Sequence, residues 1–162
     1  MPDFPAIRVG QGFDIHPFST DPDRPMMLAG VAFPGPGLAG HSDADVIAHA
    51  VTDAFLGAAG LGDIGSHFPD TDPALQGADS IELLRAAMRG VRDAGWTPLN
   101  ADCSVVLDAP KLAPVREAMQ ERLSEAVGAP VTIKGKRPEG IGALGRGDGI
   151  ACWAVALVAR PQ

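Results

Sequence analysis

The sequence predicts a single α+β domain in which helices pack on one face of a mixed β-sheet. Its 162 residues are 46% hydrophobic and 20% charged, which suits one globular domain with a substantial core. Strand-like and helix-like segments follow in the order β-β-α-α-β-α-β-β, which is typical of the α+β class. We find no internal repeat, linker or low-complexity segment, so residues 1–162 are treated as one domain.

The first strand is expected at residues 7–15. Its alternation places Asp14 and His16 on the same side of the strand. Gly10 and Gly12 share that side, and we expect them to leave the backbone uncovered for a ligand. The strand therefore predicts a polar, accessible surface beside an apolar one.

The longest predicted helix carries a histidine in the middle of its polar face. The helix should begin near Asp43, because Ser42 and Asp45 form a capping box. At about 100° per residue, His49 lies between Asp45 one turn earlier and Asp53 one turn later, opposite an apolar face. We expect these two carboxylates to orient the His49 ring.

The other elements follow from apolar periodicity and turn residues. A short hairpin or bent strand is expected at 26–33, further helices at 79–95 and 114–128, and further strands at 101–107, 131–134 and 150–158. The last strand is apolar at every position, so both of its faces should be buried. Three helices can cover only one face of the sheet, so we expect self-association to cover the other.

Composition excludes several classes of function. The net charge of −7 argues against broad binding to nucleic acid or to anionic membranes. The longest apolar run, residues 150–159, is too short to span a membrane. Cys103 and Cys152 lie in apolar runs and are expected to be buried free thiols in a reducing compartment. Residues 1–5 contain no secretory signal, so a cytoplasmic protein is expected.

Three residues form a candidate metal site. Asp14 and His16 on the strand, with His49 on the helix, provide one carboxylate oxygen and two imidazole nitrogens, a ligand set for zinc with a fourth position open. The spacing alone leaves a purely structural role for these residues open. His41 and Ser42 precede the predicted helix, whose N-terminus would favour a bound phosphate.

Short motifs along nearly the whole chain make it resemble the 2-C-methyl-D-erythritol 2,4-cyclodiphosphate synthase family. The motifs lie at residues 12–16, 41–43, 48–53, 61–65, 68–73, 109–111 and 145–151. The resemblance implies a homotrimeric phosphorus–oxygen lyase of non-mevalonate isoprenoid biosynthesis, with active sites between subunits. Its substrate would be 4-diphosphocytidyl-2-C-methyl-D-erythritol 2-phosphate, whose 2-phosphate attacks the β-phosphorus, expels CMP and closes the 2,4-cyclodiphosphate.

The resemblance also implies a role for each matched residue. Zn²⁺ would be held by Asp14, His16 and His49, and a second divalent cation, Mg²⁺ or Mn²⁺, by Glu139 together with the substrate phosphates. His41 and Ser42 would contact phosphate, and Arg146 would make a further substrate contact. The methylerythritol pocket would contain Asp63, Gly65, Phe68, Pro69, Asp70, Thr71 and Asp72. The adjacent subunit would supply a cytidine pocket of Ala109, Pro110, Lys111 and Leu112.

One segment departs from the family pattern. The family commonly has threonines before the matched Glu139, whereas this chain has Lys136, Arg137 and Pro138, and Ala143 replaces a bulky apolar residue. A guanidinium can bind phosphate oxygens through two hydrogen bonds, so Arg137 could replace the usual threonine contact, or it could belong to a solvated loop. We take His41 and Arg137 as the candidate catalytic residues.

Two other functions remain open at this point. The chain could be a zinc phosphohydrolase in which a metal-bound water attacks the substrate. Alternatively, it could be a non-catalytic trimer that binds a nucleotide or an isoprenoid phosphate.

Overall fold

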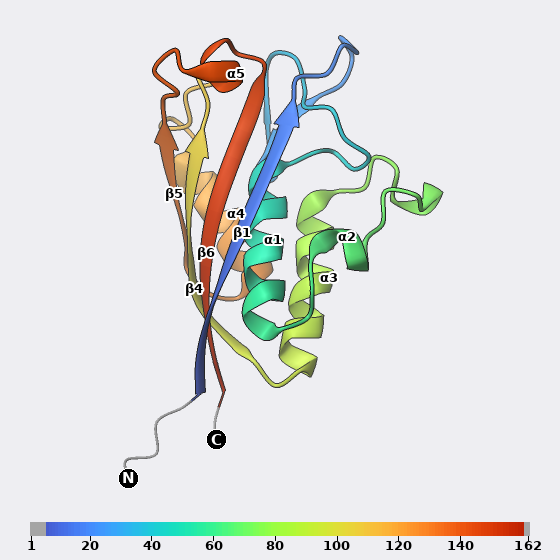
Figure 1. The fold of residues 1–162 in the computed structure, drawn as a ribbon, viewed down its shortest axis with the longest axis vertical. Helices are drawn as coiled ribbons and strands as arrows, with labels where there is room; N and C mark the ends of the chain where they lie inside the picture. Colours follow the sequence, from blue (N-terminus) through green and yellow to red (C-terminus); the bar gives the residue numbers. More distant parts are fainter. Residues whose placement is uncertain (1–5, 161–162) are drawn as a thin grey trace.

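The sheet has four strands in the order β1-β6-β4-β5. These strands are β1 (Ala6–Pro17), β4 (Thr97–Val106), β5 (Val131–Lys136) and β6 (Gly149–Arg160). In the computed structural model, which describes residues 6–160, β6 pairs antiparallel with both β1 and β4, and β4 pairs parallel with β5 (Figure 1). The predicted mixed sheet is confirmed. The prediction about residues 1–5 lies outside the described residues.

A hairpin forms where the sequence predicted one. β2 (Met26–Leu28) and β3 (Val31–Phe33) pair antiparallel around Ala29 and Gly30. Both turn residues have positive φ, 51° and 70°, which matches a tight two-residue hairpin turn.

Three long helices lie on one side of the sheet (Figure 1). They are α1 (Val46–Ala59), α3 (Ser80–Asp93) and α4 (Arg116–Val127). α1 packs on β1 and β6, α4 lies beside β5, and α3 packs on α1 and α4. Shorter elements, α2 (Ile64–His67), η1 (Pro73–Leu75) and α5 (Gly142–Gly145), occupy segments predicted to be loops.

The predicted start of α1 is wrong, and most of its predicted polar face is buried. The helix begins at Val46 because Asp45, not Ser42, is its N-cap and accepts hydrogen bonds from the N–H groups of Ile47 and Ala48. Every residue of α1 except Asp53 and Gly57 is buried, since the helix lies between the sheet and α3.

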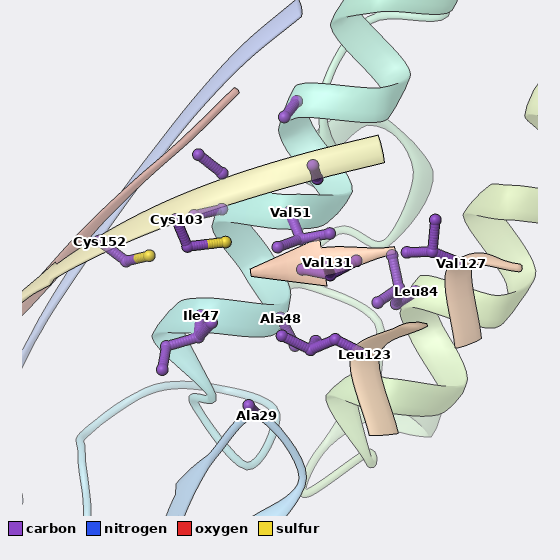
Figure 2. Close-up of a cluster of buried hydrophobic side chains, with 14 of the residues drawn as sticks. Ala29, Ile47, Ala48, Val51, Leu84, Cys103, Leu123, Val127, Val131 and Cys152 are labelled. Atoms are coloured by element: carbon purple, nitrogen blue, oxygen red, sulfur yellow. The ribbon is translucent and has the colours of Figure 1, made fainter. Parts of the chain in front are cut away.

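The core between the layers is aliphatic. Figure 2 shows Val51 of α1 among Leu84 of α3, Leu123 of α4 and Val131 of β5. All four side chains are at most 2% exposed, so α1 is held from several sides. A helix fixed in this way can place a side chain from its first turn with little freedom.

The two strand glycines also have a role that the sequence prediction missed. A Cβ at Gly12 would lie 1.9 Å from the carbonyl oxygen of Ala50, and one at Gly10 would lie 2.0 Å from that of Ala54. The glycines therefore let the backbone of α1 approach β1 closely, and they do not leave a ligand surface open.

The opposite face of the sheet carries exposed apolar side chains. Val9 is 68% exposed, Phe13 44%, Trp153 39% and Val155 48%, and the ring centroids of Phe13 and Trp153 are 4.8 Å apart. The prediction that both faces of β6 are buried is therefore not met within one chain. Such a patch is typical of a protein–protein contact surface.

The two cysteines are free and buried, as predicted. They lie on the neighbouring strands β4 and β6 (Figure 2). A hydrogen bond with Cys103, together with burial, raises the pKa of the Cys152 thiol. Within residues 6–160, none of the helices has the length and apolar character needed to cross a membrane.

Candidate active site and metal centre

Asp14, His16 and His49 come together as the sequence predicted. Asp14 Oδ2 lies 3.0 Å from His16 Nε2 and 3.0 Å from His49 Nδ1, and the two ring nitrogens are 3.4 Å apart. One ligand atom from each residue lies within 4.8 Å of the others. A carboxylate and two imidazoles that converge in this way fit Zn²⁺ or a similar divalent ion, so the donor set agrees with the predicted metal site.

The packing of α1 on β1 builds this cluster. Asp14 and His16 share one face of β1 because strand side chains alternate, and that face looks towards the helices. His49 directly precedes Ala50, whose carbonyl oxygen makes the close approach to Gly12. The glycine contact therefore sets the distance between His49 and Asp14.

The electrostatics of the cluster favour a paired state. Burial raises the pKa of Asp14, but hydrogen bonds with His16 and His49 and their positive charges outweigh it and lower that pKa to about 2. Burial lowers the pKa of His16, and the hydrogen bond and charge of Asp14 outweigh this effect and raise it. Without a metal, hydrogen bonds from the His16 and His49 rings therefore keep the carboxyl group of Asp14 ionised.

Hydrogen bonds on the outer side of each ring fix its orientation. His16 Nδ1 donates to the carbonyl oxygen of Ala39 at 2.6 Å, which leaves Nε2 facing Asp14. On His49 the outer nitrogen is Nε2, which lies 2.9 Å from Ser80 Oγ and 3.0 Å from Ser42 Oγ.

The predicted support for His49 by Asp45 and Asp53 is wrong. Asp45 is fully buried and accepts hydrogen bonds from four backbone N–H groups, those of Ala29, Gly30, Ile47 and Ala48. Asp53 accepts from the N–H of Ile64. Burial is the main cause of the raised pKa of each carboxyl group. Asp45 thus joins the hairpin to α1, and Asp53 joins α1 to α2.

Ser80 is one of the site residues that the sequence prediction missed. It is the first residue of α3, directly after the N-cap Asp79, and it is 0% exposed. Nothing in its local sequence distinguishes it from an ordinary serine at the start of a helix. Only the packing of α3 against α1 brings its hydroxyl to His49.

A cavity of about 450 Å³ opens beside the metal cluster. Asp14, His16 and His49 line it, and so do six other predicted site residues: His41, Ser42, Gly65, Phe68, Pro69 and Asp70. Gly40, Ile64, Leu75 and Leu83 complete the lining and were not predicted. The cavity therefore joins the predicted metal site to most of the predicted methylerythritol pocket.

Of the three remaining predicted residues of that pocket, two cap short helices. Asp63 is exposed and caps α2, and hydrogen bonds from the hydroxyl and the N–H of Ser66 lower its pKa. Asp72 caps η1, and its carbonyl oxygen lies 2.7 Å from His41 Nε2, which donates to it. Thr71 is exposed between them.

Three of the four predicted cytidine residues, all except Ala109, line a second cavity of about 260 Å³. Pro110, Lys111 and Leu112 are in its wall, and the Ala109–Pro110 peptide bond is cis. Arg137, the second candidate catalytic residue, lines the same cavity.

Glu139 and Arg146 lie in the glycine-rich loop between β5 and β6. Glu139 is exposed and has a φ of 52°. Arg146 is exposed and forms an ion pair with Asp148 at 3.0 Å. In the single chain, both lie outside the linings of the two cavities as described.

A family model described as the YgbB family matches residues 7–159. The chain belongs to the YgbB family. A curated relative from Bordetella petrii, named 2-C-methyl-D-erythritol 2,4-cyclodiphosphate synthase, is 56% identical over 158 residues, which cover 95% of this chain and 96% of the relative.

Solved structures share the fold of this YgbB chain. The IspF–CDP complex from Plasmodium falciparum matches with a TM-score of 0.83 and 30% identity, over 98% of this chain and 99% of that one. The bifunctional IspDF from Campylobacter jejuni matches with a TM-score of 0.91 and 40% identity over 97% of this chain. The chain spans 43% of the length of that bifunctional protein. The predicted single α+β domain agrees with these structures.

Proposed function

We propose that this chain is a 2-C-methyl-D-erythritol 2,4-cyclodiphosphate synthase, a phosphorus–oxygen lyase of non-mevalonate isoprenoid biosynthesis. It would convert 4-diphosphocytidyl-2-C-methyl-D-erythritol 2-phosphate to the cyclodiphosphate and CMP. The observation that carries the proposal is the convergence of Asp14, His16 and His49 at the wall of a 450 Å³ cavity. Relatives that carry the synthase name, at up to 56% identity among those compared, support it.

The reaction brings one phosphate against another, so its barrier is dominated by repulsion between anions. Catalysis then rests on neutralising that charge and aligning the reacting atoms, and it needs no protein nucleophile. When bound at Asp14, His16 and His49, Zn²⁺ would supply positive charge to the diphosphate. His41 and Ser42, in the same cavity wall, would orient the phosphate side of the substrate.

The phosphate contact must come from side chains and from local backbone. α1 begins at Val46, and Asp45 already accepts hydrogen bonds from the first free N–H groups, so this helix N-terminus does not provide the anion site expected from the sequence. His41 remains the candidate catalytic residue on this side. The methylerythritol part would lie against Gly65, Phe68, Pro69 and Asp70, with Asp63 and Asp72 capping α2 and η1 beside it and Thr71 exposed next to Asp72.

The second cavity suits the diphosphocytidyl end of the substrate. Ala109, Pro110, Lys111 and Leu112 would form the cytidine pocket, in agreement with the CDP present in the Plasmodium relative. Four of the chain's 13 Lys and Arg residues line this cavity, namely Lys111, Arg116, Lys136 and Arg137, in a chain of net charge −7. This local positive charge supports Arg137 as a phosphate contact in place of threonine.

Two further residues would complete the site from the β5–β6 loop. Glu139 would hold a second divalent cation, Mg²⁺ or Mn²⁺, between the substrate phosphates, because carboxylate oxygens suit such hard cations. Arg146 would make a further substrate contact. Both side chains are exposed in the single chain and are therefore available to a substrate or to a neighbouring subunit.

We further propose a homotrimer with the active sites between subunits. The exposed apolar side chains Val9, Phe13, Trp153 and Val155 support self-association through the uncovered face of the sheet. Contact between subunits would bring the cytidine cavity of one chain to the metal cavity of the next. The two buried free thiols support a protein that acts in the reducing cytoplasm.

The test is turnover followed by phosphorus NMR. The protein is incubated with the diphosphocytidyl substrate, Zn²⁺ and Mg²⁺, and the proposal predicts a cyclic diphosphate and an equal amount of CMP. His49→Ala should abolish turnover while light scattering still detects a trimer. An open-chain product would indicate a phosphohydrolase, and substrate binding without conversion would indicate a non-catalytic binding protein.

A further inference from the structure

His49 is tied to a buried polar group on a different helix. Its Nε2 lies 2.9 Å from the hydroxyl of Ser80, the first residue of α3. The Ser80 hydroxyl also donates to Asp43 Oδ1, and the Ser80 N–H donates to Asp43 Oδ2 at 3.2 Å. Asp43 and Ser80 therefore form a connected pair behind a candidate metal ligand.

The geometry gives this chain of hydrogen bonds a direction. His49 Nδ1 faces Asp14 and His16, so Nδ1 must be unprotonated when it binds a metal, and Nε2 then carries the proton. The Ser80 hydroxyl uses its own proton on Asp43 and can accept only through its oxygen. The order is therefore His49 Nε2–H to Ser80 Oγ–H to the Asp43 carboxylate.

Ser42 supports the same direction. Its Oγ accepts from the N–H of Ala44 at 3.1 Å and lies 3.3 Å from Ser80 Oγ and 3.0 Å from His49 Nε2. The Ser42 hydroxyl can give its proton to Ser80, which leaves every polar atom of the cluster with a partner. Ser80 is fully buried, so water cannot replace its hydroxyl without rearrangement.

We propose that Asp43 and Ser80 are positioning residues that hold His49 in its Nε2–H tautomer, with Nδ1 directed at the metal. Metal affinity is thereby coupled to the packing of the α3 N-terminus on α1. The inference rests on the proposed metal site and adds to it two residues on which the affinity of that site depends. Ser80 is not part of the lining of the 450 Å³ cavity, so it would act through His49.

Zinc affinity of the purified protein provides the first test. Zn²⁺ is titrated in competition with a chromophoric chelator, without substrate. Ser80→Ala should weaken Zn²⁺ binding by about 10–100-fold, the effect typical of losing the outer hydrogen bond of a ligating histidine. Ser124→Ala is the matched control, because Ser124 Oγ accepts from the N–H of Val131 far from this site, and its affinity should stay within about twofold of the parent protein.

The tautomer provides a second readout that a general loss of stability would not move. Long-range ¹H–¹⁵N NMR of the Zn²⁺-bound protein, with the histidines isotopically labelled, should show His49 bound through Nδ1 and protonated at Nε2. In Zn²⁺-bound Ser80→Ala the Nε2–H resonance should move, because this N–H loses the Ser80 hydroxyl as its acceptor. An unchanged Nε2–H resonance would overturn the proposal.

A second variant, Asp43→Asn, covers the case in which Ser80→Ala fails to fold, and where both variants fold they form a double-mutant cycle. Asp43→Asn keeps the side-chain shape but removes the charge that holds the Ser80 hydroxyl, so alone it should weaken Zn²⁺ binding more than the control does. In the Ser80→Ala background Asp43→Asn should have little further effect, because the chain of hydrogen bonds from His49 to Asp43 is already broken. Additive losses of Zn²⁺ affinity would refute this chain. Failure of the parent protein to bind Zn²⁺ would instead refute the metal site itself.

Discussion

The close contact between β1 and α1 at Gly12 sets the geometry of the candidate metal centre. In Gly12→Ala the new Cβ would meet the Ala50 carbonyl oxygen at 1.9 Å and the Ala54 nitrogen at 2.7 Å, whereas Cβ contacts under 3.0 Å essentially do not occur. The helix would have to move away by more than 1 Å at Ala50. Both partners are backbone atoms of a helix packed on several sides, so the cost should reach about 3 kcal/mol, the upper end for overpacking.

The same movement displaces His49, the residue before Ala50. Metal–ligand distances tolerate changes of only about 0.2 Å, so Zn²⁺ affinity should fall together with stability. Urea unfolding of the metal-free protein followed by circular dichroism measures the first effect, and chelator competition measures the second. Gly57→Ala is the matched control, because its Cβ would have only Gln11 oxygen nearby, at 3.8 Å, and should stabilise the helix by about 0.5–1 kcal/mol. Equal stability of the two variants would refute the role of Gly12.

Three further predictions concern a buried carboxylate, the pH dependence and the cationic cavity. Asp45→Ala should lower the free energy of unfolding in urea by about 3 kcal/mol or more, because four backbone N–H groups lose their acceptor; a loss below 1 kcal/mol would contradict this. The pKa of Asp14 is lowered from 3.8 to about 2, so its contribution to metal-free stability should vanish as pH falls through that interval. The pKa of His16 is raised above 6.5, so its contribution should vanish as pH rises through the raised value. Urea titrations should therefore give greatest metal-free stability between about pH 4 and 6.5, and a flat profile would count against the pair. Arg137→Ala should weaken CDP binding about tenfold in calorimetry and leave cytidine binding intact. The control Arg89→Ala, on α3, should leave the binding of both ligands unchanged. Equal losses of CDP and cytidine binding in Arg137→Ala would show that Arg137 makes no phosphate contact.

The part of the site that could be predicted from sequence depends on local periodicity. Asp14 and His16 share a strand face because side chains alternate, and His49 belongs to a helix that any reading of residues 46–59 would find. Their meeting follows from packing that helix on that strand. The metal set could therefore be predicted before its geometry was known.

The parts that the sequence did not reveal depend on contacts between distant segments. From the sequence, Gly12 was expected to leave the backbone uncovered, whereas in the fold α1 fills the space beside it. From the sequence, Asp45 was placed on the polar face of the helix. In the fold it is buried, and the N–H groups of Ala29 and Gly30 in the hairpin turn donate hydrogen bonds to its carboxylate. Ser80 lies 31 positions from His49, and only the packing of α3 on α1 brings the two together.

In the proposed reaction the substrate's own phosphate, not water, displaces CMP. Turnover in ¹⁸O-enriched water, followed by mass spectrometry of both products, distinguishes the two nucleophiles. We expect neither CMP nor the cyclic product to gain a solvent oxygen, because the new P–O bond forms within the substrate. One ¹⁸O atom per turnover in either product would identify a hydrolase and refute the cyclisation.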